Sequence, residues 1–263
     1  MKMRRLSPAF LFTLATAFIT LALVLFRTVA LFANFDPTVQ HYASPVTESL
    51  ATYGFFVPLL LFIPLTLLLP KETRLTHIGE RNRFFYLPIL VLLIASSIEL
   101  FVTAVAERLT TLSFLFAILA AIAAGVSALP YLFKLLKLPV SDGTHRLLLA
   151  FSAVYMILYA MFSYFDERHY MNNPNAMLIT LTATVLALLF FYDANSLTDG
   201  GARLTLYLMA SGFTLAVSTA LPALLYRFSG GGSLVSSLVF ELLLLSAALP
   251  YALRLFIYGG GNQ

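Results

Sequence analysis

The stretch FFYLPILVLLIASSIELFVTA, from Phe84 to Ala104, carries a single charged residue, Glu99. A helix needs about 20 mostly apolar residues to cross the hydrocarbon core of a bilayer, so this stretch predicts a transmembrane helix. The whole chain has the same character, since 60% of its 263 residues are hydrophobic and 11% are charged. Soluble domains use about 25% charged residues, which indicates that lipid solvates this protein.

Seven further segments share this composition. The loops between them are too short to hold a soluble domain, so we predict one domain over residues 1–263. The predicted fold is all-α, a polytopic transmembrane helical bundle of about eight spans. The spans are expected near Pro8–Ala33, Tyr53–Leu69, Phe84–Ala104, Leu112–Phe133, Leu147–Phe165, Met177–Tyr192, Leu204–Tyr226 and Leu234–Ile257.

Basic residues gather in alternate loops, which sets the expected orientation. They precede the first span and recur in Lys71–Arg83, Lys134–Arg146 and Asp193–Arg203. A basic excess marks the cytoplasmic side, so we predict a multi-pass protein of the cell membrane with both termini in the cytoplasm. The first apolar run exceeds the about 7–15 residues of a signal peptide core, and we expect it to be retained as a span.

Two similar octapeptides suggest an internal repeat. SALPYLFK runs from Ser127 to Lys134, and AALPYALR runs from Ala247 to Arg254. Similar short motifs follow the first and second spans of each half, so we predict two parallel repeats, at about 1–138 and 139–263. Transporters built from repeats tend to bind their substrates between them, although a repeat can equally serve only as a scaffold.

Three charged residues fall inside predicted spans: Arg27, Glu99 and Glu241. Each lies about six or seven residues from the outer end of its span, which at 1.5 Å per residue is roughly 9–10 Å. Charges at such depth are unfavourable and mark functional sites by default. We predict that Arg27 pairs with one or both glutamates and lines a cavity open to the outside. A purely structural ion pair, or an arginine that reaches to the interface, would explain the same pattern.

The external loops hold a second set of candidates, in which Asp36 precedes His41 and Asp166 precedes His169. Carboxylate and imidazole groups suit zinc or a proton site. Their spacing is loose, however, and loop caps or solvated charges explain them equally well, so no metal site is predicted.

Several kinds of chemistry are excluded or disfavoured. The chain has no cysteine, which removes disulfides, thiolate metal sites and cysteine nucleophiles. It has no phosphate loop, dinucleotide fingerprint or zinc protease motif, and no histidine falls within a predicted span. We therefore expect no cofactor and no catalytic residue. The net charge of +4 is spread over short loops, so no nucleic-acid partner is expected either.

Three classes of function remain. The first is a small-solute transporter, or a substrate-binding transporter subunit, with its site between the two repeats. The second is a non-catalytic scaffold or sensor-type subunit that docks a partner in the membrane or the cytoplasm. A membrane-embedded enzyme acting on lipid is the least favoured. The first predicts a polar cavity between the halves, and the second predicts a filled centre.

Overall fold

The computed structural model describes residues 7–69, 86–166, 173–194, 202–232 and 234–260. Within these residues, eight helical segments are long and apolar enough to cross a membrane, in agreement with the predicted number. Two short strands, β1 and β2, pair antiparallel between the first and second segments. The elements are α1 (Pro8–Asn34), β1 (Phe35–Asp36), β2 (His41–Tyr42), α2 (Pro45–Tyr53), α3 (Phe56–Leu67), α4 (Tyr86–Ala106), α5 (Thr111–Leu136), α6 (Asp142–Phe165), α7 (Pro174–Ala194), α8 (Ala202–Phe228) and α9 (Leu238–Gly260).

Serine caps explain where several helices begin. The hydroxyls of Ser7 and Ser44 accept hydrogen bonds from the backbone N–H groups of Phe10 and Thr47. Each is followed by a proline at the first helical position, where the missing N–H would have no helical partner in any case. Ser141 caps α6 in the same way through the N–H of Thr144.

The second span begins earlier than predicted and is broken. It starts at Pro45 instead of Tyr53, and it consists of α2 and α3 with a break at Gly54 and Phe55. Pro58 explains the break, because it has no N–H to donate to the carbonyl of Gly54 and its ring crowds that carbonyl. Hydropathy alone missed the first half, because Pro45–Tyr53 is more polar than the rest of the span.

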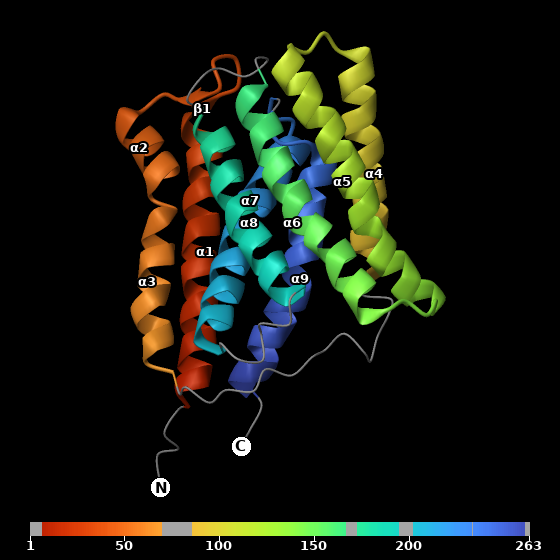
Figure 1. Cartoon of the computed structure of the whole chain (residues 1–263). Coiled ribbons are helices and arrows are strands. Elements are labelled where there is room, and N and C mark those ends of the chain that lie inside the picture. The colour runs from red at the N-terminus through yellow and green to blue at the C-terminus, as the bar shows by residue number, and fades with distance from the viewer. Residues whose placement is uncertain (1–6, 70–85, 167–172, 195–201, 233, 261–263) are drawn as a thin grey trace, which may run out of the picture.

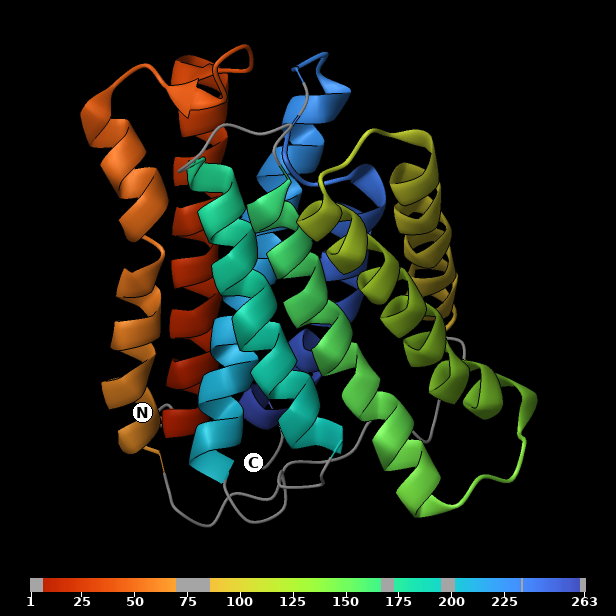
Figure 2. The same ribbon diagram turned by 45° about the horizontal axis from the view of Figure 1, so that its top comes forward.

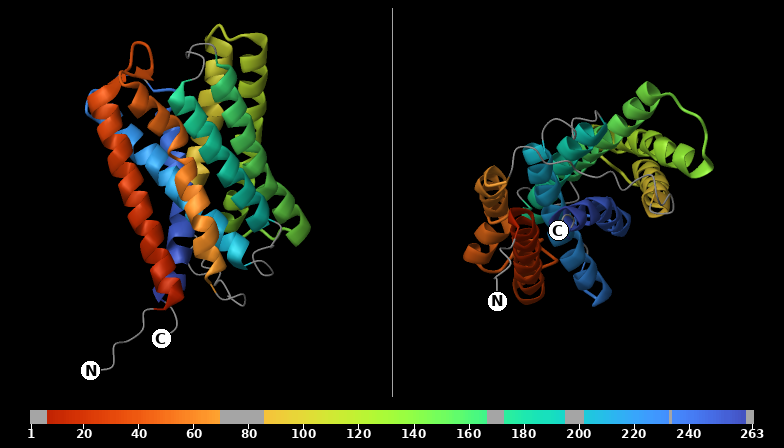
Figure 3. Two further views of the ribbon diagram at one scale, coloured as in Figure 1. Left: turned by 90° about the vertical axis from the view of Figure 1, so that its left-hand side faces the viewer. Right: turned by 90° about the horizontal axis from the view of Figure 1, so that it is seen from below.

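Consecutive spans run in opposite directions through the bundle, and α1 begins at the same end at which α9 ends (Figure 1). We call this the proximal end, and the opposite end, where α1 ends and α9 begins, the distal end. Helix α8 lies at the centre and packs against α1, α3, α7 and α9 (Figure 3). Its buried side chains are mostly small, and Ala210, Ala216, Ala220 and Ala223 are inaccessible to solvent. Small residues let helix backbones approach closely within a membrane.

The two predicted repeats do not pack alike. Helices α1 and α3 pack against α8, whereas α4 packs against α5 and α9, and α5 packs against α6. In the described residues, α1 and α3 make no extensive contact with α4 or α5. The first four spans therefore do not form a bundle of their own, whereas α6, α7, α8 and α9 pack in sequence.

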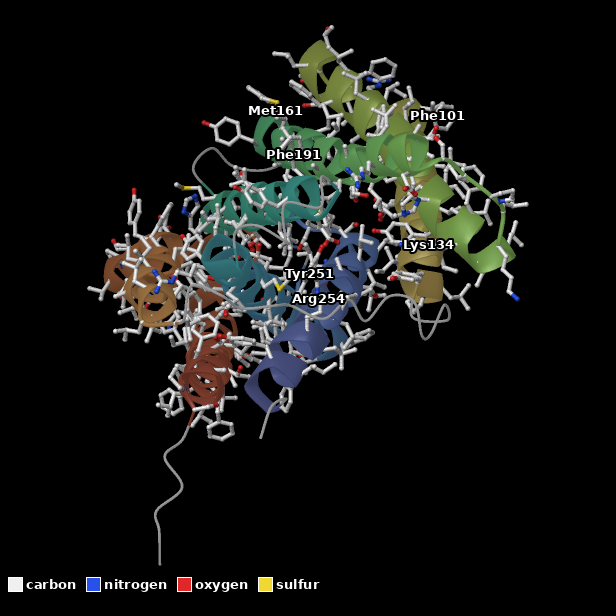
Figure 4. All side chains as sticks on the ribbon, turned by 60° about the horizontal axis from the view of Figure 1, so that its bottom comes forward. Phe101, Lys134, Met161, Phe191, Tyr251 and Arg254 are labelled. Carbon is white, nitrogen blue, oxygen red and sulfur yellow. The ribbon has the colours of Figure 1, made fainter. Side chains whose placement is uncertain are left out.

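The perimeter of the bundle is apolar. Phe18, Leu60 and Val105 are more than half exposed, and so is Phe101, which Figure 4 labels with the outward-lying Met161 and Phe191. Large apolar patches of this kind are rare on soluble monomers. They fit helices that contact the lipid bilayer.

Candidate functional site

All three charged residues predicted inside spans lie in the distal half. Arg27 is seven residues before the end of α1, and Glu99 is seven residues before the end of α4, which places both roughly 10 Å from those ends. Glu241 differs from its prediction, because α9 begins at Leu238 and not at Leu234. It therefore lies in the first turn of α9, where the helix N-terminus stabilises negative charge.

Glu241 has a different partner from the one expected. Its carboxylate accepts hydrogen bonds from Arg227 Nη2 at 3.1 Å and Arg227 Nε at 3.4 Å. The Ser236 hydroxyl donates a third, at 2.6 Å. Glu241 is 0% exposed and Arg227 is 27% exposed, so the ion pair runs from the interior of the bundle toward its surface.

Glu99 is half-buried and lies next to this pair. The Ser237 hydroxyl donates to Glu99 Oε2 at 2.8 Å, and the same hydroxyl accepts from the Phe240 N–H. Ser237 also donates its backbone N–H to the hydroxyl of Tyr159 on α6, whose ring stacks on Phe240 at 3.6 Å. The hydroxyls of the consecutive residues Ser236 and Ser237 thus donate hydrogen bonds to Glu241 and Glu99, respectively. Helices α4, α6, α8 and α9 meet at this point.

These contacts place non-helical backbone well inside the bundle. Tyr159 lies six residues before the end of α6, roughly 9 Å below it, and Glu99 lies at a similar depth in α4. The connection between α8 and α9 therefore runs down from the end of α8 to reach this level (Figure 2). At membrane depth such backbone is tolerated only inside protein or beside a water-filled cavity.

Arg27 pairs with neither glutamate, so that part of the prediction is wrong. Its Nη2 donates to Asn175 Oδ1 on α7 at 3.2 Å, and its Nη1 donates to the Ser218 carbonyl on α8 at 3.5 Å. Glu241 lies within electrostatic range of Arg27 but is bound by Arg227. The reason is geometric, because the side chain of Arg27 meets α7 and α8, whereas Glu99 faces the start of α9.

A buried polar layer covers Arg27 on the distal side. Asn173 Nδ2 donates to Gln40 Oε1 at 2.9 Å, and Asn173 Oδ1 caps α7 by accepting the Asn175 N–H at 2.8 Å. Tyr42 of β2 is also buried here. Burial raises the pKa of the Tyr42 phenol, and the positive charge of Arg27 lowers it in part, so the phenol stays neutral near pH 7.

The loop candidates separate into different surroundings. Asp36 and His41 face each other across the β1–β2 pair, but Asp36 accepts the Thr38 N–H at 2.8 Å and His41 Nδ1 lies 3.0 Å from Glu48 Oε1. Asp166 is buried at the end of α6, and His169 lies outside the described residues. In the parts of the chain that the structure describes, no three His, Asp or Glu side chains are grouped to hold a metal ion.

The two octapeptides meet at the proximal end. Tyr131 of α5 and Tyr251 of α9 are buried, and both lie within electrostatic range of Asp193 at the end of α7. Arg254 Nη1 donates to Asp193 Oδ1 at 3.1 Å, and Lys134 Nζ lies 5.1 Å from the centre of the Tyr86 ring. Figure 4 shows Lys134, Tyr251 and Arg254 at this end of the bundle.

A groove between α1, α8 and α9 has a different character. Its volume is about 260 Å³, and its lining is almost wholly apolar. It extends from Thr13 to Val24, which lies one turn before Arg27. Its lining makes it unsuited to a charged solute.

Sequence reasoning missed the residues that complete the distal site: Arg227, Ser236, Ser237 and Asn175. The predicted spans place Arg227 in a loop, and Ser236 and Ser237 at the start of the last span. One signal was available for Ser237, because a serine before an apolar run is a typical helix cap. Nothing in the sequence pointed to Asn175.

The fold and its perimeter define a class, since the eight long apolar helical segments found in the described residues, with apolar side chains exposed around the bundle, are those of an integral membrane protein. No protein-family profile, curated protein or solved structure matches the chain.

Proposed function

We propose that this protein is a small-solute carrier of the cell membrane, whose solute site lies in the distal half around Glu99, Glu241, Arg227 and Arg27. One observation carries the proposal. The connection between α8 and α9 descends to the level of Glu99, roughly 10 Å inside the end of α4, and there presents Ser236 and Ser237 to two glutamates. Transporters commonly build their sites from such interrupted helices, whose free backbone groups and N-termini meet the solute.

Glu99 is the carboxylate that a solute or proton would meet first. It is half-buried and has a hydroxyl partner, whereas Glu241 is already bound by Arg227 and Ser236. Intramembrane carboxylates of this kind serve substrate and proton pathways. Asp36 and His41 are proposed to lie at the entrance to the site, at the distal surface, and the buried Asp166 is proposed to lie beneath that surface, at the end of α6.

The proposed orientation places the proximal end in the cytoplasm. Among the described residues near that end are Lys134, Lys137, Arg146, Arg203 and Arg254. A basic excess on one side of the spans favours that side as cytoplasmic. The parallel repeat remains a proposal, supported by the meeting of the two octapeptides, and the different packing of the two halves does not favour it.

The alternative function, a non-catalytic scaffold or sensor-type partner subunit, is favoured by the core around α8. That core is closely packed with small side chains, as expected for a centre that does not open. A carrier must expose its site to water from both sides of the membrane in turn, and a scaffold need not.

Cysteine labelling separates these functions, because the native chain contains no cysteine. We would introduce Glu99→Cys and Ser237→Cys singly and treat intact cells and inverted vesicles with a membrane-impermeant methanethiosulfonate. Ala216→Cys, in the sealed core, is the unreactive control, and Thr38→Cys, in the exposed distal loop, is the reactive one. Thr38→Cys should react only in intact cells, which checks the orientation.

A carrier predicts that both site cysteines react from each side. Reaction from the distal side alone would overturn carriage and favour a sensor-type subunit. Rates as low as that of Ala216→Cys from both sides would favour the scaffold.

A further inference from the structure

We propose that Arg27 and Asn175, at the first turn of α7, form a binding site for a small monovalent anion. The inference rests on the proposed function, because it assigns the ligand chemistry of one part of the same distal site.

The guanidinium of Arg27 is buried, and no carboxylate of the described residues pairs with it. The side chain is 2% exposed, and its two hydrogen bonds go to neutral oxygens, the Asn175 amide and the Ser218 carbonyl. A guanidinium has five N–H donors, so three are left over, and the Nε group has no partner among the described residues. A buried charge without a partner is strongly unfavourable, which makes an acceptor at this position valuable.

Asn175 adds a second set of orphan donors. Its Oδ1 accepts from Arg27, but its buried Nδ2 group has no partner within the part of the chain described. The residue is 3% exposed, so bulk water does not serve this group. Arg27 and Asn175 therefore leave more N–H donors here than there are acceptors, and an anion can accept several such hydrogen bonds at once.

The N-terminus of α7 increases the positive potential. Pro174 has no N–H, and Asn173 accepts those of Asn175 and Met177, so the contribution of this terminus is the positive end of the helix dipole, which favours a negative charge. Helix termini alone do not make a site, but here the terminus meets a buried cation and two unpartnered side-chain groups.

No carboxylate in the part of the chain that the structure describes neutralises Arg27. Glu241, within electrostatic range, is bound by Arg227 and Ser236. Tyr42, the other described titratable group that acts on Arg27, is neutral near pH 7. One uncompensated positive charge remains, so a monovalent ion balances it, whereas a dianion would leave a net negative charge in a medium of low dielectric constant. Chloride and a small carboxylate share this chemistry.

Thermal unfolding of the purified full-length protein in detergent tests the proposal. We would measure the unfolding midpoint by circular dichroism in sodium chloride, sodium acetate or sodium gluconate at matched ionic strength. Gluconate is the reference, because its size excludes it from a buried site. We expect a saturable rise in the midpoint with chloride, acetate or both, since a ligand that binds only the folded protein stabilises it. The arm that responds identifies the anion.

Variants locate the effect. Arg27→Gln should lose the anion-dependent rise, and Asn175→Leu should shift the response to higher concentration. Arg27→Lys keeps the charge and should retain a weakened response, so it serves if Arg27→Gln does not fold. Arg254→Lys, a buried and paired arginine at the proximal end, is the matched control and should respond as wild type.

Equal unfolding midpoints in all three salts would overturn the proposal. An anion-dependent rise in the midpoint that persists unchanged in Arg27→Gln would also overturn it. So would a rise that persists unchanged both in Arg27→Lys and in Asn175→Leu. None of these results depends on transport. Failure of the anion site would leave the labelling of Glu99→Cys and Ser237→Cys unaffected, and failure of that labelling would leave the anion response intact.

Discussion

Removing Arg227 should destabilise the protein more than removing Glu241, although the two side chains form one ion pair. Arg227→Gln leaves the Glu241 carboxylate 0% exposed, with the Ser236 hydroxyl as its remaining side-chain partner. Glu241→Gln leaves a guanidinium that is 27% exposed and still donates to the Ser236 carbonyl at 2.7 Å. Water can reach the stranded arginine but not the stranded glutamate.

The expected magnitudes follow from this difference. Stranding one member of a fully buried pair destabilises by about 3–5 kcal/mol, and the N-terminus of α9 offsets up to about 1 kcal/mol for Glu241. We therefore expect Arg227→Gln to lower the free energy of unfolding by about 2–4 kcal/mol. Glu241→Gln should lower it by about 1–2 kcal/mol, since the remaining charge is partly hydrated.

The double variant should be more stable than the sum of the single effects allows, because neither charge is then stranded. We expect a coupling energy of about 1–3 kcal/mol. The assay is reversible unfolding by SDS in mixed micelles, followed by circular dichroism. His41→Gln is the control, since its pair with Glu48 is about a third exposed on each side and should be worth less than about 1 kcal/mol. Equal effects of Arg227→Gln and Glu241→Gln, or a coupling energy below about 0.5 kcal/mol, would refute the reasoning.

Two further predictions use the same unfolding assay. Tyr155→Phe should lower the free energy of unfolding by about 1–3 kcal/mol, because the Tyr155 hydroxyl lies 2.7 Å from the fully buried Ser96 hydroxyl. If the losses caused by Tyr155→Phe and Ser96→Ala were fully additive in the double variant, this hydrogen bond would not be the cause. Gly212→Val should lower the free energy of unfolding by about 1–3 kcal/mol, because a Cβ atom at Gly212 would lie 3.0 Å from Leu189 Cδ2 and 3.3 Å from Leu186 Cδ2. Gly143→Val is the control, because a Cβ atom at Gly143 would meet nothing within 4 Å. A Gly143→Val protein no more stable than Gly212→Val would contradict this account of packing.

The number of spans, and the places of Arg27 and Glu99 along their helices, could be predicted because both follow from distance along the chain. A run of apolar residues fixes where a helix crosses, and the rise of 1.5 Å per residue fixes the level of Arg27 and Glu99. The prediction failed where apolar residues are not helical. Leu234 and Val235 extended the last predicted span, but they lie in the descending connection, and Ser237 caps α9 just after them.

The pairing of charges could not be predicted, because it depends on how helices distant in sequence are rotated and arranged. Hydropathy places Arg27, Glu99 and Glu241 at similar depth, which made an ion pair among them reasonable. It does not say that Arg27 meets α7 and α8, nor that Arg227 turns inward to Glu241. A residue at a helix end, such as Arg227, carries no sign in the sequence that it leaves the interface for the interior.

The two octapeptides show how a repeated motif can have a local cause. In each, a cation follows the tyrosine by three residues, so both side chains lie on the same face of the helix. At the proximal end, Tyr131 and Tyr251 converge on Asp193, and Arg254 pairs with it. Both tyrosines thus lie near one aspartate, whereas the two cations differ, since Arg254 pairs with Asp193 and Lys134 lies over the Tyr86 ring. This common position near Asp193 favours a buried tyrosine at the matching place on α5 and α9, even though the helices that precede them pack differently in the two halves of the chain.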